Sequence, residues 1–327
     1  MTSFPTRRLR RLRANQTMRD ILADVRLSVD ELIAPLFVRE GSGVRNPIES
    51  MPGQFQFSVD TALKTAKRWS DLGLKSVLLF GIPDKKDAVG SEAWNDAAAV
   101  QRLTREIKTA LPHMMVITDV CLCEYTEHGH CGTLIDGDGP MDVDNDVTLE
   151  SLARVAASHA RCGADIVAPS AMMDGQVQAI RSMLDADGFA NTAIMSYAVK
   201  FASALYGPFR QAAEGAPSSG DRKTYQMDYR STHQILPEAE QDADEGADIL
   251  MVKPAWTYLD VIAEVRRNFD QPLAAYHVSG EFSVLHAAAE KGWIDLKSSA
   301  IEVTSAIKRA GADLVITYFA EQLATWI

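Results

Sequence analysis

Eight short apolar segments recur beyond residue 30, and between them the apolar positions repeat with the 3.6-residue period of helices. The segments are Leu32–Val38, Ser76–Gly81, Met114–Leu122, Asp165–Ser170, Ala193–Lys200, Asp248–Ala255, Leu273–Gly280 and Asp313–Ala320. Near-continuous apolar strands that alternate with helices predict a parallel sheet covered on its outer face. Eight such units predict an α/β fold of the (β/α)8, or TIM-barrel, type. A doubly wound open sheet is the runner-up, but no G-x-G-x-x-G motif follows the first segment.

Glycines mark the ends of the predicted helices. Residues Asp146–His159 are expected to form one helix, with Asp146 or Thr148 as its N-cap and an end near Gly163. The tripeptide Gly-Ala-Asp recurs at 163–165, 246–248 and 311–313, each time just before an apolar segment. This is typical of a C-terminal glycine that leads from a helix into the next strand.

The first 30 residues differ from the rest of the chain. They carry a basic cluster of Arg7, Arg8, Arg10, Arg11, Arg13 and Arg19, although the whole chain has a net charge of −11. That negative charge argues against nucleic acid as a partner for the body of the protein. We therefore expect residues 1–30 to form an extended arm that docks on an acidic neighbour, and residues 31–327 to form the barrel.

The chain also gives expectations about its compartment. No apolar run approaches the roughly 20 residues that span a bilayer, and the N-terminus lacks the apolar core of a signal peptide. Of the four cysteines, Cys121, Cys123 and Cys131 lie in one motif. Clustered cysteines without an export signal predict a reducing, cytoplasmic compartment and no membrane partner.

The three clustered cysteines have a C-x-C-x7-C spacing within residues 118–132. Adjacent C-x-C sulfurs strain to pair as a disulfide, so a soft-metal site, with zinc as the metal, is the better interpretation. Three thiolates would leave one position open for catalysis, whereas His128 or His130 could close a structural knuckle. The spacing by itself leaves both possibilities open.

Polar residues gather at the carboxyl ends of the predicted strands. They are Asp119, Ser170, Lys200, Lys253, Ser279 and Tyr318. In a barrel these ends converge on one mouth, where such enzymes carry out their chemistry. The convergence favours a catalytic site over a structural knuckle for the three cysteines.

Lys200 and Lys253 each follow an apolar strand, and lysine is seldom buried unless it is paired or functional. A single such lysine would more often reach out to a carboxylate at the rim. Two on adjacent strands would depress each other's pKa, and a neutral amine can form a Schiff base with a ketone. Arg210 and Arg222 flank Glu214–Gly220, a turn-prone stretch that predicts a mobile lid. The two arginines are either a carboxylate clamp or ordinary surface charge.

These residues stand in long motifs that resemble the porphobilinogen synthase (5-aminolevulinate dehydratase) family. The motifs are DVCLCEYTEHGHCG, APSAMMDGQVQAIR, AIMSYAVKFASALYGPFR, GDRKTYQMD, LMVKPA, YHVSGE and IKRAGADLVITYFA. The resemblance runs from RRLR near Arg7 to the end of the chain. It implies a barrel with an N-terminal arm that wraps a neighbouring subunit, usually in a homo-octamer.

The resemblance also implies an activity, the condensation of two 5-aminolevulinate molecules to porphobilinogen with loss of two waters, in tetrapyrrole (haem) biosynthesis. It implies that Lys253 binds the first substrate as a Schiff base, that Lys200 holds the second, and that Asp119 orients groups between the metal and the lysines. It assigns one substrate carboxylate to Ser279 and Tyr318, and the other to Arg210 and Arg222 with Gln226 beside them. Cys121, Cys123 and Cys131 match the zinc-dependent branch of the family.

Two positions depart from the family pattern. Glu238 occupies the slot where many members bind an activating magnesium, but Pro237 replaces an expected arginine and is expected to disturb the interior of a helix. Ala171 stands where many relatives carry aspartate. A Schiff-base aldolase of the TIM-barrel class would share one lysine and the arginines, and a binding protein could hold zinc in a structural knuckle. Neither alternative needs two lysines together with three thiolates.

Overall fold

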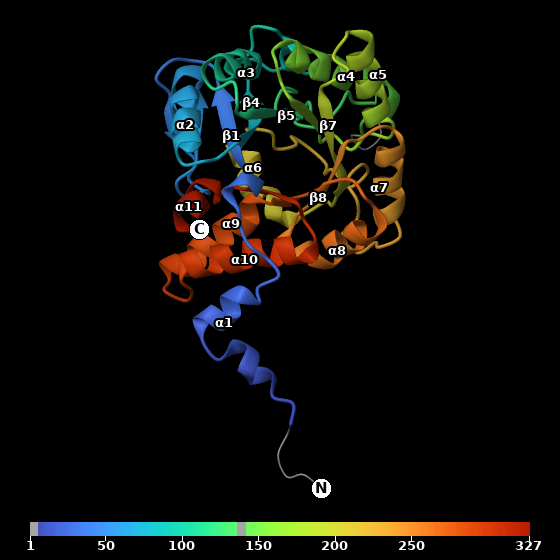
Figure 1. The fold of residues 1–327 in the computed structure, drawn as a ribbon. Coiled ribbons are helices and arrows are strands. Elements are labelled where there is room, and N and C mark those ends of the chain that lie inside the picture. Colours follow the sequence, from blue (N-terminus) through green and yellow to red (C-terminus); the bar gives the residue numbers. More distant parts are fainter. Residues whose placement is uncertain (1–5, 136–141) are drawn as a thin grey trace.

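Eight parallel strands close into a barrel in the computed structural model, which describes residues 6–135 and 142–327 (Figure 1). The barrel strands are β1 (Leu32–Arg39), β4 (Ser76–Ile82), β5 (Met115–Val120), β6 (Ile166–Pro169), β7 (Ala193–Lys200), β8 (Ile249–Lys253), β9 (Leu273–His277) and β10 (Leu314–Thr317). They follow one another in chain order, and β10 pairs with β1 to close the barrel. The predicted (β/α)8 fold is confirmed.

A short antiparallel hairpin was not predicted. Its strands β2 (Arg45–Pro47) and β3 (Phe55–Ser58) extend the sheet beside the end of β1, where Phe37 lies opposite Gln56. Three- and four-residue strands with mixed polar and apolar positions carry too little periodicity to be recognised from the sequence. The hairpin brings Gln56 to the carboxyl end of β1.

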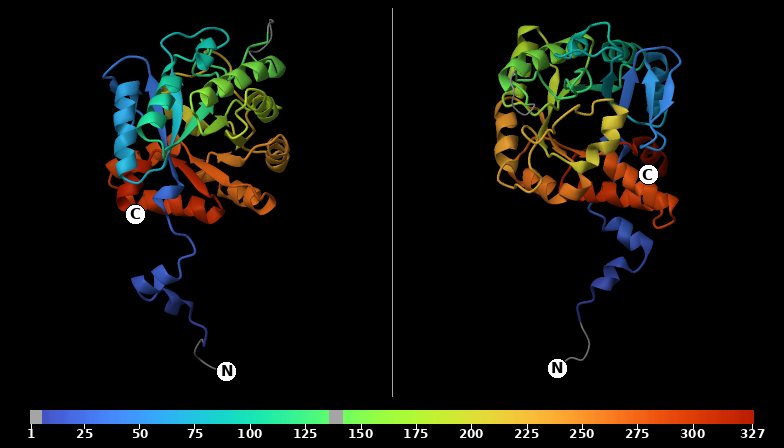
Figure 2. Two further views of the ribbon diagram at one scale, coloured as in Figure 1. Left: turned by 45° about the horizontal axis from the view of Figure 1, so that its top comes forward. Right: turned by 180° about the vertical axis from the view of Figure 1, so that it is seen from behind.

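Helices surround the barrel in every view (Figures 1 and 2). They are α2 (Val59–Asp71), α3 (Ala99–Ala110), α4 (Asn145–Arg161), α5 (Gln176–Ala186), α6 (Gly207–Ala212), α7 (Ile235–Asp244), α8 (Leu259–Asn268), α9 (Ser279–Glu290), α10 (Leu296–Ala310) and α11 (Ala320–Trp326). The predicted cap of α4 is wrong. Asp144 caps this helix, because its side chain accepts a hydrogen bond from the backbone N–H of Val147.

The three Gly-Ala-Asp tripeptides do lead from helix to strand as predicted. Gly163, Gly246 and Gly311 have φ values of +96°, +106° and +125°, a region that favours glycine. The aspartates Asp165, Asp248 and Asp313 accept hydrogen bonds of 2.8 Å from the backbone N–H groups of Val116, Ile194 and Leu273. Each aspartate therefore ties the start of its own strand to the start of the preceding strand.

The last two predicted strands are shorter in the structure. Strand β9 ends at His277, and α9 begins at Ser279. Strand β10 ends at Thr317, so Tyr318 follows it directly. Both side chains remain at the carboxyl end of the barrel, but a helix turn or a strand-to-helix corner positions them instead of a pleated strand.

The N-terminal segment extends away from the barrel (Figures 1 and 2). Within it lie a 3₁₀ helix (Leu9–Arg13) and α1 (Gln16–Ile21), and neither of these described elements has a buried residue. Residues 1–5 of the predicted arm lie outside the described residues. In the part of the chain that the structure describes, no helix combines the length and the apolar character needed to cross a membrane.

Candidate active site

The two predicted lysines lie side by side at the carboxyl end of the barrel. Lys200 ends β7, Lys253 ends β8, and the two residues are opposite each other in the register of these strands. Each is only 5% exposed. The ring of Tyr197 faces both, with its centroid 5.5 Å from the Lys200 Nζ and 5.0 Å from the Lys253 Nζ.

Aromatic rings surround the Lys253 amine. Its Nζ lies 4.3 Å from the ring centroid of Tyr276, 5.1 Å from that of Phe209 and 5.2 Å from that of Tyr206. Burial among these rings, and then the charge of Lys200, lower the pKa of Lys253 to about 7. A substantial fraction of this amine is therefore neutral near pH 7, which is the form that attacks a carbonyl carbon.

Polar groups surround Lys200 instead. Its Nζ donates a hydrogen bond to the backbone carbonyl of Ser170, and the Ser170 hydroxyl donates to the Asp119 Oδ2 at 3.1 Å. The Asp119 Oδ1 has no hydrogen-bond partner among the described residues. Burial, followed by repulsion from Glu124, raises the pKa of Asp119 to about 8. The second lysine is therefore next to a buried carboxyl group with one oxygen available.

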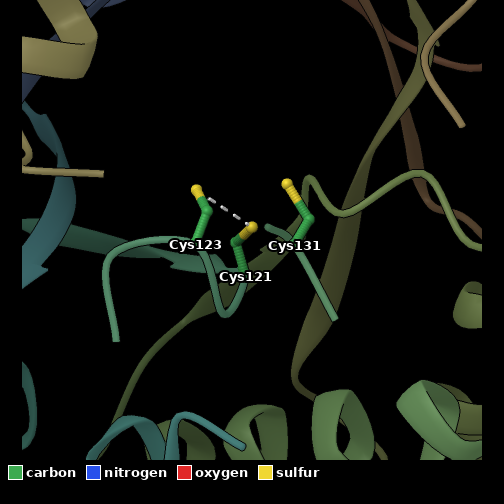
Figure 3. A group of neighbouring side chains, drawn as sticks. All are labelled: Cys121, Cys123 and Cys131. Atoms are coloured by element: carbon green, nitrogen blue, oxygen red, sulfur yellow. Dashed lines mark hydrogen bonds between the residues drawn. The ribbon is translucent and has the colours of Figure 1, made fainter. Parts of the chain in front are cut away.

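The three predicted cysteine ligands converge on one point (Figure 3). Their sulfur atoms all lie within 4.8 Å of one another, and those of Cys121 and Cys123 are 3.5 Å apart. Tetrahedral zinc with bonds of about 2.3 Å holds its sulfur ligands about 3.8 Å apart, so this spacing fits zinc.

Ionisation of the thiols also fits a metal site. Burial raises the pKa of Cys121, whereas hydrogen bonds from Cys121 and Cys123 lower the pKa of Cys131 well below its usual range. Cys131 is thus the thiol that ionises most readily, and a bound cation would take the place of the remaining thiol protons.

Neither histidine of the motif joins the three sulfur atoms. The ring nitrogens of His130 lie 3.0 Å from the Tyr225 hydroxyl and 3.0 Å from the Ser219 carbonyl oxygen. The Nε2 of His128 lies 3.1 Å from the Ala88 carbonyl oxygen. Because these nitrogens already have partners, the protein supplies three thiolates in the described cluster and no imidazole.

Arg210, Arg222 and Gln226 line the same space as Cys123 and the two lysines. The Nε atoms of both arginines and both amide atoms of Gln226 are buried without a hydrogen-bond partner among the described residues. Burial and the charge of Arg222 lower the pKa of Arg210. Unpartnered buried donors are costly, and a bound carboxylate would satisfy them.

A cavity of about 20 Å³ joins these groups. Its lining consists of Phe80, Asp119, Cys123, Glu124, Ser170, Lys200, Tyr206, Phe209, Arg210, Arg222, Gln226 and Lys253. Seven of the predicted site residues are therefore in direct contact with one space. The space holds about one water molecule, so this conformation is closed.

Ser279 and Tyr318 do not line that cavity. The Ser279 hydroxyl accepts a 2.9 Å hydrogen bond from the Phe209 backbone N–H, and the Tyr318 hydroxyl lies 2.9 Å from that of Tyr276. The rings of Phe209 and Tyr276 face the Lys253 amine. Each of the two hydroxyls therefore contacts a residue that forms a wall of the Lys253 pocket.

Glu238 lies in a separate pocket of about 420 Å³, whose lining includes Asp174 and Gln226. Burial and then the charge of Asp174 raise the pKa of Glu238. The prediction that Pro237 disturbs a helix interior is wrong. Pro237 is the third residue of α7, in the first turn, where a backbone N–H has no partner within the helix and its loss costs little.

Several residues of the site were not predicted. Tyr206, Phe209 and Tyr276 form the aromatic walls around Lys253, and the Glu124 carboxylate accepts a hydrogen bond from the Cys123 thiol. Tyr197 was visible in the sequence, three residues before Lys200 in an apolar strand. The others come from different segments, and no local pattern marks which aromatic residue faces a lysine.

Paired buried lysines and three facing thiolates at the mouth of a (β/α)8 barrel define a barrel enzyme with a soft-metal site. Comparison with known proteins identifies the family. Residues 6–326 match the delta-aminolevulinic acid dehydratase family. The chain is 54% identical over 322 residues to the delta-aminolevulinic acid dehydratase of Methanothermobacter thermautotrophicus, covering 98% of this chain and 97% of the relative. It is 50% identical over 324 residues to that of Synechococcus elongatus, covering 99% of both.

A solved structure agrees. The delta-aminolevulinic acid dehydratase of Toxoplasma gondii, solved with its reaction product porphobilinogen, superimposes with a TM-score of 0.96 at 42% identity, covering 99% of this chain and 92% of that chain. The chain therefore belongs to the delta-aminolevulinic acid dehydratase, or porphobilinogen synthase, family and is an enzyme of tetrapyrrole biosynthesis. The aldolase and binding-protein alternatives are thereby excluded.

Proposed function

We propose that this enzyme joins two 5-aminolevulinate molecules through Schiff bases on Lys253 and Lys200, with loss of two waters overall. The observation that carries the proposal is the pairing of these two buried lysines in register at the ends of β7 and β8. One buried lysine would suffice for an aldolase. Two, opposite each other, allow both ketone substrates to be held at once, which removes the entropic cost of bringing them together during the reaction.

Each lysine acts in the same chemical way. The neutral amine adds to the ketone carbon of its substrate, water leaves, and the resulting C=N bond makes that carbon more electrophilic and its neighbouring carbon more acidic. The lowered pKa of Lys253 supports its attack on the first substrate. Asp119 would orient groups between the two amines, because its Oδ1 has no hydrogen-bond partner within the described ranges and Ser170 holds its Oδ2.

Cys121, Cys123 and Cys131 would hold zinc, as the spacing and ionisation of their sulfur atoms support. When bound, zinc supplies a positive charge that polarises or positions the second substrate. These three sulfur atoms are soft ligands, which suit zinc better than magnesium.

The carboxylates of the two substrates would bind at opposite ends of the site. Arg210, Arg222 and Gln226 would bind that of the second substrate, since the Nε atoms of both arginines and the Gln226 amide are buried without a partner in the part of the chain that the structure describes. Ser279 and Tyr318 would bind that of the first once the Lys253 pocket opens, because their hydroxyls lie directly behind its walls.

Two further expectations concern regulation and assembly. We propose that Glu238 takes part in binding an activating magnesium, supported by its neighbour Asp174 in the second pocket.

The arm would hold a second copy in a homo-oligomer, expected to be an octamer. Leu9, Leu12 and Ile21 on the arm are more than half exposed, and a partner that covers them would bury apolar surface.

The decisive test is borohydride reduction in the presence of 5-aminolevulinate, followed by mass spectrometry of the peptides. Reduction should fix the substrate on Lys253, and pyrrole formation should accompany it in the untreated enzyme. Label on other lysines alone, with Lys253 unmodified, would contradict the assignment.

A further inference from the structure

One residue next to the site has an unusual backbone. Glu214 has φ of +51°, and within the described ranges only one other non-glycine residue, Met172, has a positive φ. This region is unfavourable for a residue with a Cβ, and it persists only where the surroundings enforce it. The surroundings of Glu214 therefore hold it in this conformation.

Three side chains hold Glu214. Arg39 Nη1 and Gln56 Nε2 donate to its Oε1 at 3.2 and 3.1 Å, and Lys86 Nζ donates to its backbone carbonyl. Arg39 also binds the Gln56 side chain at 2.8 Å, so the two donors brace each other. We call Glu214 with Arg39, Gln56 and Lys86 the Glu214 clasp. It joins the end of β1, strand β3 and the loop after β4 to a segment that follows α6.

The clasp is one residue away from contacts with both arginines of the site. The backbone N–H of Gly215 donates to the Arg210 carbonyl at 3.2 Å, and the Gly215 carbonyl accepts from Arg222 Nη2. Arg222 donates from the same nitrogen to the Gly129 carbonyl at 2.7 Å. The backbone conformation at Glu214 and Gly215 therefore holds the Arg222 guanidinium and the backbone of Arg210.

Beyond Gly215, the segment Glu214–Gly220 packs against the loop of residues 121–131, which carries the three cysteines. The Ser218 N–H donates to the His128 carbonyl at 2.9 Å, and a Cβ added to Gly129 would lie 2.2 Å from the Ala216 carbonyl oxygen. Arg210 and Arg222, which the start of this segment contacts, line the cavity of about 20 Å³. The segment is thus held at two places, by the clasp at Glu214 and by these contacts with residues 128 and 129.

We propose that Glu214 is a positioning residue whose clasp keeps the segment Glu214–Gly220 closed and so sets Arg210 and Arg222 for a substrate carboxylate. The role of the arginines rests on the proposed function above. The closing of the segment by the clasp does not, and can be measured without substrate.

Weakening the clasp should act on substrate affinity more than on turnover. If the segment Glu214–Gly220 is closed in only a fraction of the molecules, the apparent affinity for substrate falls in proportion to that fraction. At saturating substrate the bound molecules are again in the closed state, so turnover is little changed. The loss of a charged hydrogen bond of this kind is expected to lower the closed population about tenfold. KM for 5-aminolevulinate should then rise about tenfold, and kcat should change by less than about twofold.

Amide hydrogen exchange tests the closure directly in the full-length enzyme. In Glu214→Ala, peptides covering residues 211–224 should exchange about tenfold faster than in the wild type, and Glu214→Gln should lie between because an amide oxygen still accepts hydrogen bonds. The matched control is Asp84→Ala, since the Asp84 carboxylate lies 3.8 Å from the same Arg39 but its side chain is 63% exposed. It should leave exchange and KM unchanged.

The outcomes separate the parts of the proposal. Unchanged exchange in Glu214→Ala overturns the clasp, and faster exchange with unchanged KM overturns its positioning role. If Arg210→Ala and Arg222→Ala leave KM unchanged while exchange still rises in Glu214→Ala, the assigned role of the arginines has failed and not the closure. Should Glu214→Ala lower the melting temperature of the whole enzyme, Glu214→Gln with an unchanged melting temperature carries the test.

Discussion

The two lysines stand opposite each other but in different surroundings. Lys253 is enclosed by the rings of Tyr206, Phe209 and Tyr276, and burial lowers its pKa to about 7. Lys200 donates to the Ser170 carbonyl and lies near Asp119. We call these the aromatic side and the polar side of the site. The same residue type at the same register position is thus placed once in an apolar wall and once in a hydrogen-bonded network.

The difference suggests a division of work. An amine in an apolar pocket is easily made neutral, so the aromatic side is suited to the first covalent attack. The polar side has the thiolates, the Asp119 carboxyl group and the arginines, and it is suited to binding the polar groups of the second substrate.

The largest effect is expected from the lysines themselves. Lys253→Ala should lower kcat by about three orders of magnitude or more, because the covalent nucleophile is lost. Lys200→Ala should also stop pyrrole formation, yet borohydride should still trap substrate on Lys253. Loss of trapping at Lys253 in Lys200→Ala would mean that the two sides do not act separately.

Removal of the metal should abolish turnover and leave the fold intact. The barrel strands bury a core that does not depend on zinc, so circular dichroism should stay unchanged while pyrrole formation is lost. Added zinc should restore it. If folding and activity were lost together, the cysteines would be a structural site, because binding energy there is folding energy. Trapping at Lys253 should persist in the chelated enzyme.

Removal of a single arginine should have a smaller effect. Arg210→Ala or Arg222→Ala should each lose roughly 1.5–3 kcal/mol of binding of the second substrate, about 10- to 150-fold in kcat/KM. Trapping at Lys253 should remain. Arg230→Ala is a suitable control, since Arg230 pairs with Asp228 and its side chain is 76% exposed. An equal loss in this control would show that general charge, and not a carboxylate contact, is responsible.

The acid limb of the rate profile should report the aromatic side. With the pKa of Lys253 near 7, kcat/KM should fall as pH drops below about 7, because the amine of the free enzyme takes up a proton. Phe209→Ser would admit water and should move this limb to higher pH, whereas nearby Lys200 and Asp119 are unchanged. If the acid limb stays in place in Phe209→Ser, it belongs to another group.

The burial of Lys253 should also affect stability. A lysine in the unfolded chain has a pKa of 10.5, so the free energy of unfolding should rise with pH between about 7 and 10.5.

The smallest effect on the chemistry should come from the arm. Deleting residues 1–15 should reduce the size of the assembly without unfolding the barrel, because the strands and their helices lie beyond it. Sedimentation velocity would show the smaller species, and thermal melting would show the intact barrel. An unchanged sedimentation coefficient would rule out the arm as an assembly element.

Much of this protein was readable from its sequence because the signals are local and repeated. The apolar segments gave the eight strands, the Gly-Ala-Asp tripeptides marked three helix-to-strand corners, and the polar residues at strand ends indicated one mouth. The three cysteines and the two lysines were prominent because such residue types are rare in those positions. The resemblance to the family added the activity, which periodicity alone does not contain.

Other features depend on contacts between distant segments, and only the tertiary structure decided them. The walls around Lys253 come from α6, β9 and the turn before α6. The partners of the His128 Nε2 and of both His130 ring nitrogens lie 40 to 95 residues away. Pro237 looked disruptive until its place in the first turn of α7 was known. The clasp joins Glu214 to Arg39 across 175 positions of sequence. Burial, pKa and hydrogen-bond partners are properties of the space around a side chain, and in this barrel that space is assembled from residues that no local window of sequence contains.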